Sequence, residues 1–155
     1  MSYVIRGLSA TPFQHLYGMT EQELEAHGAK RYICDASPGF PDRIEMRDAE
    51  IGEKLLLINH VSMDKNTPYK ASHAIFILEG AEQSYEAENE IPKVMFNRLL
   101  SLRAFDAAGM MVDAAIAREE EIEVAIKNLL KNPEVEHVDA HNAHRGCFAA
   151  TITRS

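Results

Sequence analysis

The chain has 155 residues, 46% hydrophobic and 26% charged, which is typical of one globular domain and excludes an intrinsically disordered protein. A formal net charge of −8 argues against nucleic acid or an anionic membrane as the partner, because both require a basic surface. The start, MSYVIRGLSA, does not resemble a signal peptide, and no apolar run reaches transmembrane length. We therefore expect a single cytoplasmic domain over residues 1–155.

The chain is expected to begin with a strand and a short helix. The strand is predicted at residues 3–8 (YVIRGL), and the Thr-Pro pair that follows opens a turn or a short helix. Thr20 and Glu23 have the spacing of a capping box. This spacing predicts a helix that ends at Gly28.

Three further strands are predicted in the next part of the chain. Residues 30–34 (KRYIC) form the first of them. The segment DASPGFPD then predicts a loop, because it holds two prolines and a glycine, and residues 43–46 (RIEM) are a candidate short strand. Residues 54–61 (KLLLINHV) contain the continuous apolar run LLLI and are expected to form a central strand.

Two polar segments flank a strand predicted at residues 74–78 (AIFIL). The connection before it, residues 62–72, has the length of a binding loop or a lid, so we consider it a candidate gate for a site. The segment after it, EGAEQSYEAENE, contains five glutamates and no Lys or Arg. It predicts a solvated, mobile loop.

The second half of the chain contains the clearest helix signal. Pro92 suits the first turn of a helix through Arg98, and residues 99–117 are expected to form two strands around a tight glycine turn. In residues 118–131 the apolar positions follow the i, i+3, i+4, i+7, i+8 pattern of an amphipathic helix, which an Asn-Pro pair ends. Two strands around the turn NAHRG complete the chain.

Seven or eight strands and three or four helices are expected in total. The strands and helices do not alternate strictly, and several strand pairs are joined by short turns. This order predicts an α+β fold, a single compact domain with a mainly antiparallel, twisted sheet.

The chain contains two cysteines, Cys34 and Cys147, and no C-x-x-C motif. They cannot form a disulfide framework or a structural zinc site unaided, so both are expected to be thiols. Cys34 lies beside a predicted strand and is expected to be buried. Cys147 follows Arg145 and Gly146, and it either packs in the same way or is reactive through a nearby cation.

Residues 135–150 (VEHVDAHNAHRGCFAA) hold three of the seven histidines together with an Asp, an Asn, an Arg and a Cys. On a strand, His137, Asp139 and His141 would share one face and form a candidate metal site, because imidazole and carboxylate are ligands of zinc and iron. Side chains on one face of a strand lie about 7 Å apart, which is awkward for a single ion. A partly solvated polar face is the alternative.

Polar residues at predicted strand ends suggest a second, larger site. Histidine serves as an acid or a base, arginine binds carboxylate or phosphate, and Asp106 would orient a partner. In the structural alternative, Arg103 and Asp106 form a buried ion pair and Asp106 caps a turn. The candidate ligand-binding residues are His73, Arg103, Asp106, His141, Asn142 and Arg145, and the candidate catalytic residues are His141 and Cys147, as base and nucleophile, and His73.

The run LLSLRAFDAAGMMVDAAIA, followed by HVDAHNAHRGCFAATITR, closely resembles a bacterial family catalogued as a domain of unknown function, number twelve hundred and three. PYKASHAIFILEG and DAEIGEKLLLINH resemble its middle section, and the AHNA…GC…A segment is the most distinctive part. The resemblance implies a single domain over nearly the whole chain and assigns no activity or residue role. It associates a cysteine with the position of Asp42, which argues against a shared role for a cysteine pair in this chain.

Three functions remain open at this stage. The first is a small-molecule site, binding or catalytic, at the strand ends and gated by residues 62–72. The second is a non-catalytic homodimer or partner-binding protein that uses an exposed strand edge or the strand pair around residues 109–117. The third is a metal-dependent enzyme that uses His137, Asp139 and His141. The concentration of titratable residues near predicted turns favours the first, and the sequence indicates no cofactor.

Overall fold

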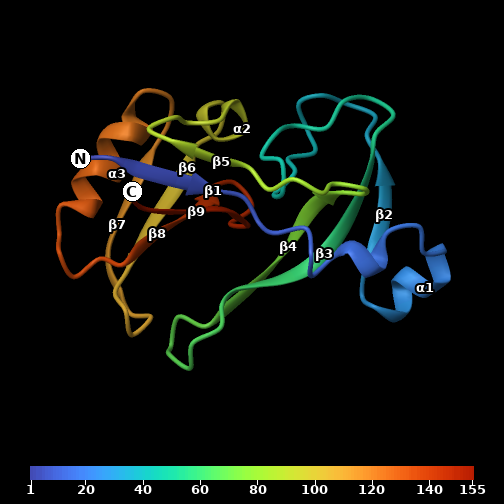
Figure 1. Ribbon diagram of the computed structural model, residues 1–155, viewed down its shortest axis with the longest axis horizontal. Helices are drawn as coiled ribbons and strands as arrows, with labels where there is room; N and C mark the ends of the chain where they lie inside the picture. Colours follow the sequence, from blue (N-terminus) through green and yellow to red (C-terminus); the bar gives the residue numbers. More distant parts are fainter.

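The computed structural model describes all 155 residues and is built mainly from strands, with three short α-helices (Figure 1). The strands form two antiparallel sheets that pack into a single compact domain, in agreement with the predicted α+β class, although one sheet was expected. In chain order the elements are β1 (Tyr3–Arg6), the 3-10 helix η1 (Gln14–Leu16), α1 (Glu21–Ala26), β2 (Lys30–Ile33), β3 (Lys54–Met63), β4 (Ala71–Leu78), β5 (Glu86–Glu88), α2 (Lys93–Phe96), β6 (Leu100–Phe105), β7 (Met111–Ala117), α3 (Glu121–Leu130), β8 (His137–Asn142) and β9 (Phe148–Arg154).

The larger sheet has six strands in the order β5-β1-β9-β8-β6-β7. The first and last strands of the chain are neighbours in it, with Tyr3 opposite Arg154. The face that α3 covers carries apolar residues such as Leu100 and Leu102 of β6, which belong to the same core as the buried side chains of α3. Arg103 lies between residues of that core and, by strand alternation, belongs to the opposite face.

The smaller sheet has the order β2-β3-β4, so the apolar strand 54–61 is central in it, as predicted. Its apolar side chains form a second core, to which α1 contributes Leu24. Phe148 also belongs to this second core, although its strand is part of the six-stranded sheet. The two sheets therefore meet at β9 and β4, and Figure 1 shows them side by side.

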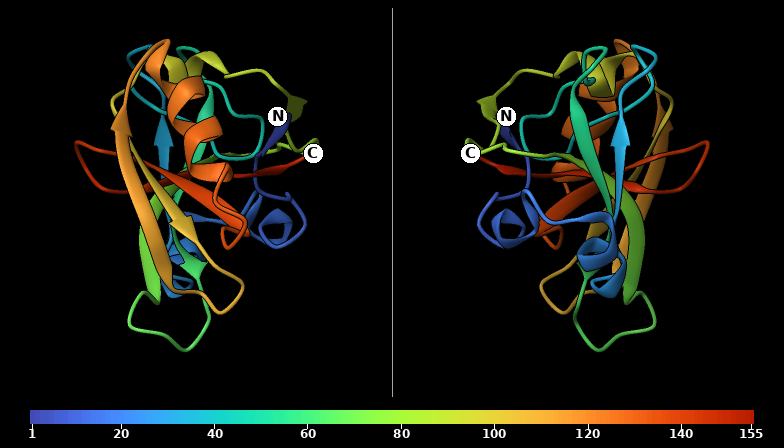
Figure 2. Two further views of the ribbon diagram at one scale, coloured as in Figure 1. Left: turned by 90° about the vertical axis from the view of Figure 1, so that its left-hand side faces the viewer. Right: turned by 90° about the vertical axis from the view of Figure 1, so that its right-hand side faces the viewer.

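The polar connection between β3 and β4 is shorter than predicted, because β3 continues to Met63 and β4 begins at Ala71. The remaining loop is attached to the turn between β6 and β7. The Thr67 hydroxyl donates to the Gly109 carbonyl at 3.0 Å, and the Lys65 ammonium donates to the Ala107 carbonyl. The two loops extend together at one end of the molecule (Figure 2), and none of residues 62–72, the predicted gate, lines the cavity described below.

Two other segments differ from their predictions for physical reasons. Residues 43–46 are not a strand, because the loop around them forms only isolated bridges, such as Asp42 with Phe76 of β4. The acidic segment after β4 contains β5, which pairs with β1 and is the edge of the large sheet. An edge strand tolerates charged side chains, and Glu86 pairs with Arg6 at 2.9 Å.

The local helix signals are confirmed. The Thr20 hydroxyl accepts a hydrogen bond from the Glu23 backbone N–H at 3.2 Å, and the Glu23 carboxylate accepts one from the Thr20 N–H at 3.1 Å. In α3 the buried residues Ile122 and Ile126 lie on the predicted apolar stripe. The Arg154 guanidinium donates to the Leu130 carbonyl and so satisfies the C-terminal end of this helix. None of the helices combines the length and the apolar character that crossing a bilayer requires.

Candidate functional site

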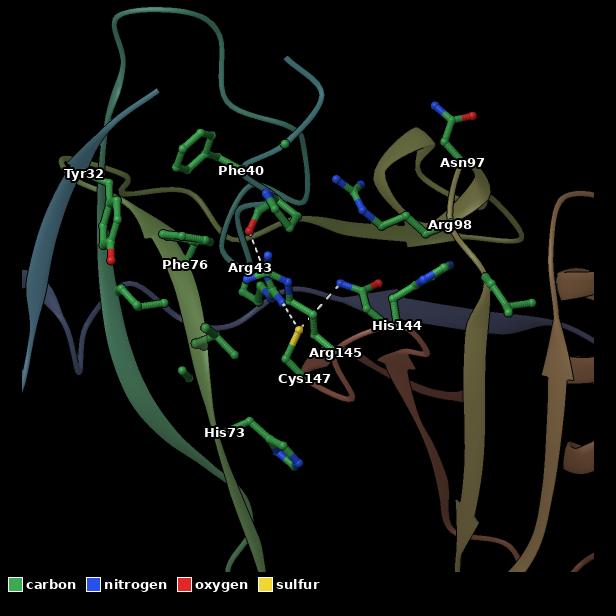
Figure 3. Close-up of a pocket in the computed structure, with 17 residues that line it drawn as sticks. Tyr32, Phe40, Arg43, His73, Phe76, Asn97, Arg98, His144, Arg145 and Cys147 are labelled. Atoms are coloured by element: carbon green, nitrogen blue, oxygen red, sulfur yellow. Dashed lines mark hydrogen bonds between the residues drawn. The ribbon is translucent and has the colours of Figure 1, made fainter. Parts of the chain in front are cut away.

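A cavity of about 770 Å³ lies between the two sheets, beside the outer edge of β4 (Figure 3). Its 17 lining residues come from β2, β3, β4, the loop before β3, the segment after α2, and the turn between β8 and β9. None of them is Asp or Glu. The cavity is therefore bordered by basic, neutral polar, aromatic and aliphatic residues and by no acidic one, in a chain whose net charge is −8.

One side of the cavity is formed by Tyr32, Phe40 and Phe76, which we call the aromatic wall. The ring centroid of Phe76 lies 5.4 Å from that of Tyr32 and 5.2 Å from that of Phe40, and both pairs meet edge to face. This is a favoured geometry for aromatic pairs. The three rings come from β2, the loop before β3, and β4, and each is half-buried.

The opposite side carries Arg98 and His144, and Arg145 lies between that side and Cys147; we call these three residues the basic wall. Arg98 follows α2 and is held by Asp48, with nitrogen–oxygen distances of 2.6 and 3.2 Å. His144 and Arg145 are exposed residues of the turn between β8 and β9. The Arg145 guanidinium has no hydrogen-bond or ion-pair partner in the protein, so it is available to a ligand.

Between these walls the buried Arg43 contacts Cys147. The Arg43 side chain is only 2% exposed, and it donates to the Phe148 carbonyl at 2.8 Å, to the Pro41 carbonyl, and to the Cys147 Sγ at 3.1 Å. Burial lowers the pKa of the guanidinium, and the neighbouring Cys147 opposes that shift. No carboxylate pairs with Arg43, because the adjacent Asp42 accepts hydrogen bonds from backbone N–H groups such as that of Leu78 at 2.7 Å.

At the lower end of the cavity in Figure 3, His73 lies against His141, with ring centroids 4.9 Å apart. His141 is 2% exposed, and its Nδ1 lies 2.9 Å from the Gly146 carbonyl, to which it donates when protonated at that nitrogen. Burial lowers the pKa of His141 to about 4, so its ring is neutral at pH 7. The Nδ1 atom of His73 is buried and has no hydrogen-bond partner, which leaves a polar atom beside the cavity unsatisfied.

Arg103 lies behind these histidines on β6. Its charge contributes to lowering the pKa of both His73 and His141, which places it within electrostatic reach of the pair. Its one hydrogen bond is long, from Nε to the Ser101 hydroxyl at 3.4 Å. Arg103 is thus a third guanidinium without a carboxylate partner, after Arg145 and Arg43, although it does not line the cavity.

The structure brings together most of the predicted ligand-binding residues. His73, Asn142, Arg145 and Cys147 line the cavity, His141 lies against His73, and Arg103 lies within electrostatic reach of both histidines. Asp106 is the exception: its carboxylate accepts the N–H groups of Ala108 and Met110, both at 2.9 Å, and so caps the turn between β6 and β7. The turn cap of the structural alternative is confirmed, whereas its ion pair between Arg103 and Asp106 is not formed.

The three candidate metal ligands make other contacts within the protein. His137 stacks on Phe105 with ring centroids 5.4 Å apart, and its Nε2 is 3.7 Å from Asp139. The Asp139 carboxylate accepts a hydrogen bond from Thr151 at 3.0 Å, and His141 is directed to Gly146. No three His, Cys, Asp or Glu side chains converge as metal ligands, so the metal site at His137, Asp139 and His141 is contradicted.

The two cysteines differ as their sequence contexts suggested. Cys34 is 1% exposed, and its thiol lies near the Ala36 and Ala49 carbonyls, which confirms the prediction of a buried residue. Cys147 lies on the wall of the cavity, where Asn142 Nδ2 is 3.9 Å from its sulfur. His141 forms no hydrogen bond with Cys147, so the predicted pairing of nucleophile and base is absent from this geometry.

The family model "Protein of unknown function (DUF1203)" matches residues 39–154. The chain belongs to the DUF1203 family. The matched range contains the basic wall, Arg43 and Cys147, whereas Tyr32 of the aromatic wall precedes it. This finding confirms the resemblance noted for the sequence. No curated protein and no solved structure matches the chain significantly.

Thirteen of the 17 lining residues had not been identified from the sequence, among them Tyr32, Phe40, Arg43, Phe76 and Arg98. The one signal near any of these five was the loop DASPGFPD, which contains Phe40 and directly precedes Arg43. A loop with a Pro-Gly turn followed by an arginine is too common to indicate a site by itself.

Proposed function

We propose that this member of the DUF1203 family binds a small organic anion in the cavity between its two sheets. The observation that carries the proposal is the charge of the lining, which includes Arg43, Arg98 and Arg145 and no acidic residue. A basic cavity in an acidic protein attracts anions selectively, because the surrounding surface repels them. A volume of about 770 Å³ is suitable for a metabolite-sized molecule.

The distribution of ion pairs supports the same proposal. Four of the nine arginines pair with carboxylates, and a fifth, Arg154, is used by carbonyl groups at the end of α3. Of the remaining four, Arg43 is held by two carbonyls and Cys147, and Arg145 lines the cavity without a protein partner. Arg103 lies within electrostatic reach of His73 and His141, and Arg118 is exposed away from the cavity. A guanidinium without a protein carboxylate is suited to bidentate binding of a carboxylate or phosphate from a ligand.

Binding is better supported than nucleophilic catalysis. Cys147 has an arginine and an amide beside its sulfur, and neither group removes a proton from an attacking thiol. The nearest candidate base, His141, has its Nδ1 engaged with the Gly146 carbonyl. The cavity thus has groups that hold an anion and lacks the hydrogen-bonded pair that covalent catalysis requires.

The proposal is tested by thermal unfolding in the presence of a panel of small carboxylates and phosphate monoesters, each with its neutral amide or alcohol. A ligand at ten times its Kd should stabilise the protein by about 1.4 kcal/mol, which raises the Tm by about 4 °C. The Arg145→Gln variant should lose this response, and Arg118→Gln, which removes an exposed arginine remote from the cavity, should retain it. If the anionic compounds and their neutral counterparts change the Tm of both variants equally, the cavity is not an anion site.

A second candidate function, a homodimer formed through β7, rests on a separate observation. This strand is an edge of the six-stranded sheet, and its Ile116 side chain is 70% exposed. Antiparallel pairing of two β7 strands would cover this edge. Asp113 is exposed in the middle of the strand and would approach its copy in such a dimer, which disfavours pairing, so we rank this function second. Sedimentation at micromolar concentration decides it, because a monomer would exclude the dimer.

A further inference from the structure

We propose that the ligand is an aromatic acid, in which a planar ring carries one carboxylate or phosphate group. This inference rests on the proposed function and names the class of anion that the cavity selects. Its basis is the separation of the two walls in Figure 3. Tyr32, Phe40 and Phe76 lie on one side, whereas Arg98 and His144 lie on the other.

The aromatic wall is suited to a ring rather than to an aliphatic chain. Its three rings already meet edge to face, at 60° for Phe40 with Phe76 and 88° for Tyr32 with Phe76. They therefore present both faces and edges within one small area, and each remains half-buried. A fourth ring that enters the cavity can add another edge-to-face or offset contact, which a saturated ring of the same size cannot form.

The basic wall is suited to a single anionic group. Arg98 is already paired with Asp48, and each of the three Arg43 guanidinium nitrogens donates to a protein acceptor, namely two carbonyls and Cys147. Arg145 is the one arginine on the lining without a protein partner. One unpaired guanidinium binds one carboxylate or phosphate, so a polyanion such as a nucleoside triphosphate would leave most of its charge without a partner.

The two ends of such a ligand are bridged by the polar centre of the cavity. Arg43, Asn142 and Cys147 lie between the walls, and they offer N–H and thiol groups in the span that separates the ring from the acid group. The cavity therefore accommodates a ring at one side and an acid group at the other.

The experiment is a chemical-shift titration of the ¹⁵N-labelled protein with four probes. Benzoate has the ring and the charge, cyclohexanecarboxylate has the charge without an aromatic ring, and benzamide has the ring without the charge. Phenyl phosphate replaces the carboxylate. We expect benzoate to bind at least about threefold more tightly than cyclohexanecarboxylate, the lower end of what an aromatic contact contributes. We expect it to bind about tenfold more tightly than benzamide, as a charge-assisted hydrogen bond allows.

Two variants separate the contributions of the walls. Phe76→Leu should bring the benzoate and cyclohexanecarboxylate affinities together while both acids remain better ligands than benzamide. Arg145→Gln should remove the preference for acid over amide, and Arg118→Gln should behave as the unaltered protein. Phenyl phosphate distinguishes a phosphate ligand from a carboxylate ligand, because the tighter binder of the two identifies the acid group.

The failure of this inference differs from the failure of the proposed function. If cyclohexanecarboxylate binds in the cavity as tightly as benzoate, the aromatic class is refuted and the anion site stands. If benzamide matches benzoate, or if shifts map away from the cavity residues, both proposals are refuted. Absence of binding by all four probes at tens of millimolar also counts against both.

Discussion

Because its buried His141 ring is neutral, the protein should lose stability as the pH falls. His141 is 2% exposed between the two sheets, with His73 and Arg103 nearby. Its pKa falls from 6.5 to about 4 on folding, mainly through burial. Above pH 6.5 the ring is neutral in both the folded and the unfolded states, so its lowered pKa does not change the free energy of unfolding. Below that pH the unfolded chain binds a proton that the folded protein excludes, and stability decreases until the pH reaches the folded pKa.

The magnitude follows from the two pKa values. The difference in proton binding integrates to about 2 kcal/mol between pH 7 and pH 5, and to about 3 kcal/mol by pH 4. Burial also lowers the pKa of His60 and His73, so these residues add to the loss of stability at acid pH. His137 acts oppositely, because Asp139 raises its pKa and its stabilisation is lost as the pH rises through that value. These terms are common to the protein and its His141 variants, so they cancel in a comparison.

The assay is urea unfolding followed by circular dichroism at pH 7, 6 and 5. The unaltered protein should lose about 2 kcal/mol more than His141→Gln over this range, and His27→Gln, which alters an exposed histidine, should match the unaltered protein. Equal pH dependence in all three proteins would refute the reasoning. The ring proton of His141, followed by NMR in the unaltered protein, gives an independent answer, because a midpoint near 6.5 would contradict the burial argument even if the Gln variant fails to fold.

Three further predictions concern other parts of the chain. Iodoacetamide should alkylate Cys147 at least tenfold faster than Cys34 in the native protein, since Cys34 is 1% exposed, and equal rates by peptide mass spectrometry would contradict the assignment of the cavity wall. Thr20→Ala should reduce the free energy of unfolding by about 1 kcal/mol through loss of the capping box, and an unchanged urea midpoint would show that α1 does not depend on it. Gly7→Ala should destabilise the protein by about 1–3 kcal/mol, because its Cβ would collide with the Ile44 and Arg43 carbonyl oxygens, and an unchanged Tm would mean that this loop moves freely.

Local signals in the sequence predicted local structure well. The capping box at Thr20, the apolar stripe of α3 and the glycine turn at Gly109 each depend on residues within one turn or one element, and the structure contains all three. The acidic segment before Pro92 was also interpreted from a local signal, its composition, and was predicted as a loop. Its glutamates disfavour burial, but the segment contains β5, which lies at a sheet edge where burial is not required.

The site was predicted only where its residues are close in the sequence. His141 and Asn142 end β8, Arg145 and Cys147 follow in the turn before β9, and a turn after a strand is a frequent location for polar functional groups. The aromatic wall depends instead on β3 pairing with both β2 and β4, and on the loop of Phe40 crossing β4. No periodicity or spacing encodes those long-range pairings. Asp106 was assigned to the site because an aspartate after a strand suits a ligand and a turn cap equally, and the short-range hydrogen bonds determine its role.

The place of β9 has a consequence for how the chain is made. This strand separates β1 from β8 in the large sheet and also supplies Phe148 to the core of the small one. Neither core is complete, and the cavity has no Cys147 wall, until β9 has been synthesised. The nascent chain should therefore stay unfolded until β9 has left the ribosome, because β1 and β8 lack their shared neighbour before then. A ribosome-bound chain stopped before residue 148 should accordingly be digested by protease as readily as an unfolded one, whereas a protease-resistant intermediate would show that the sheets assemble independently.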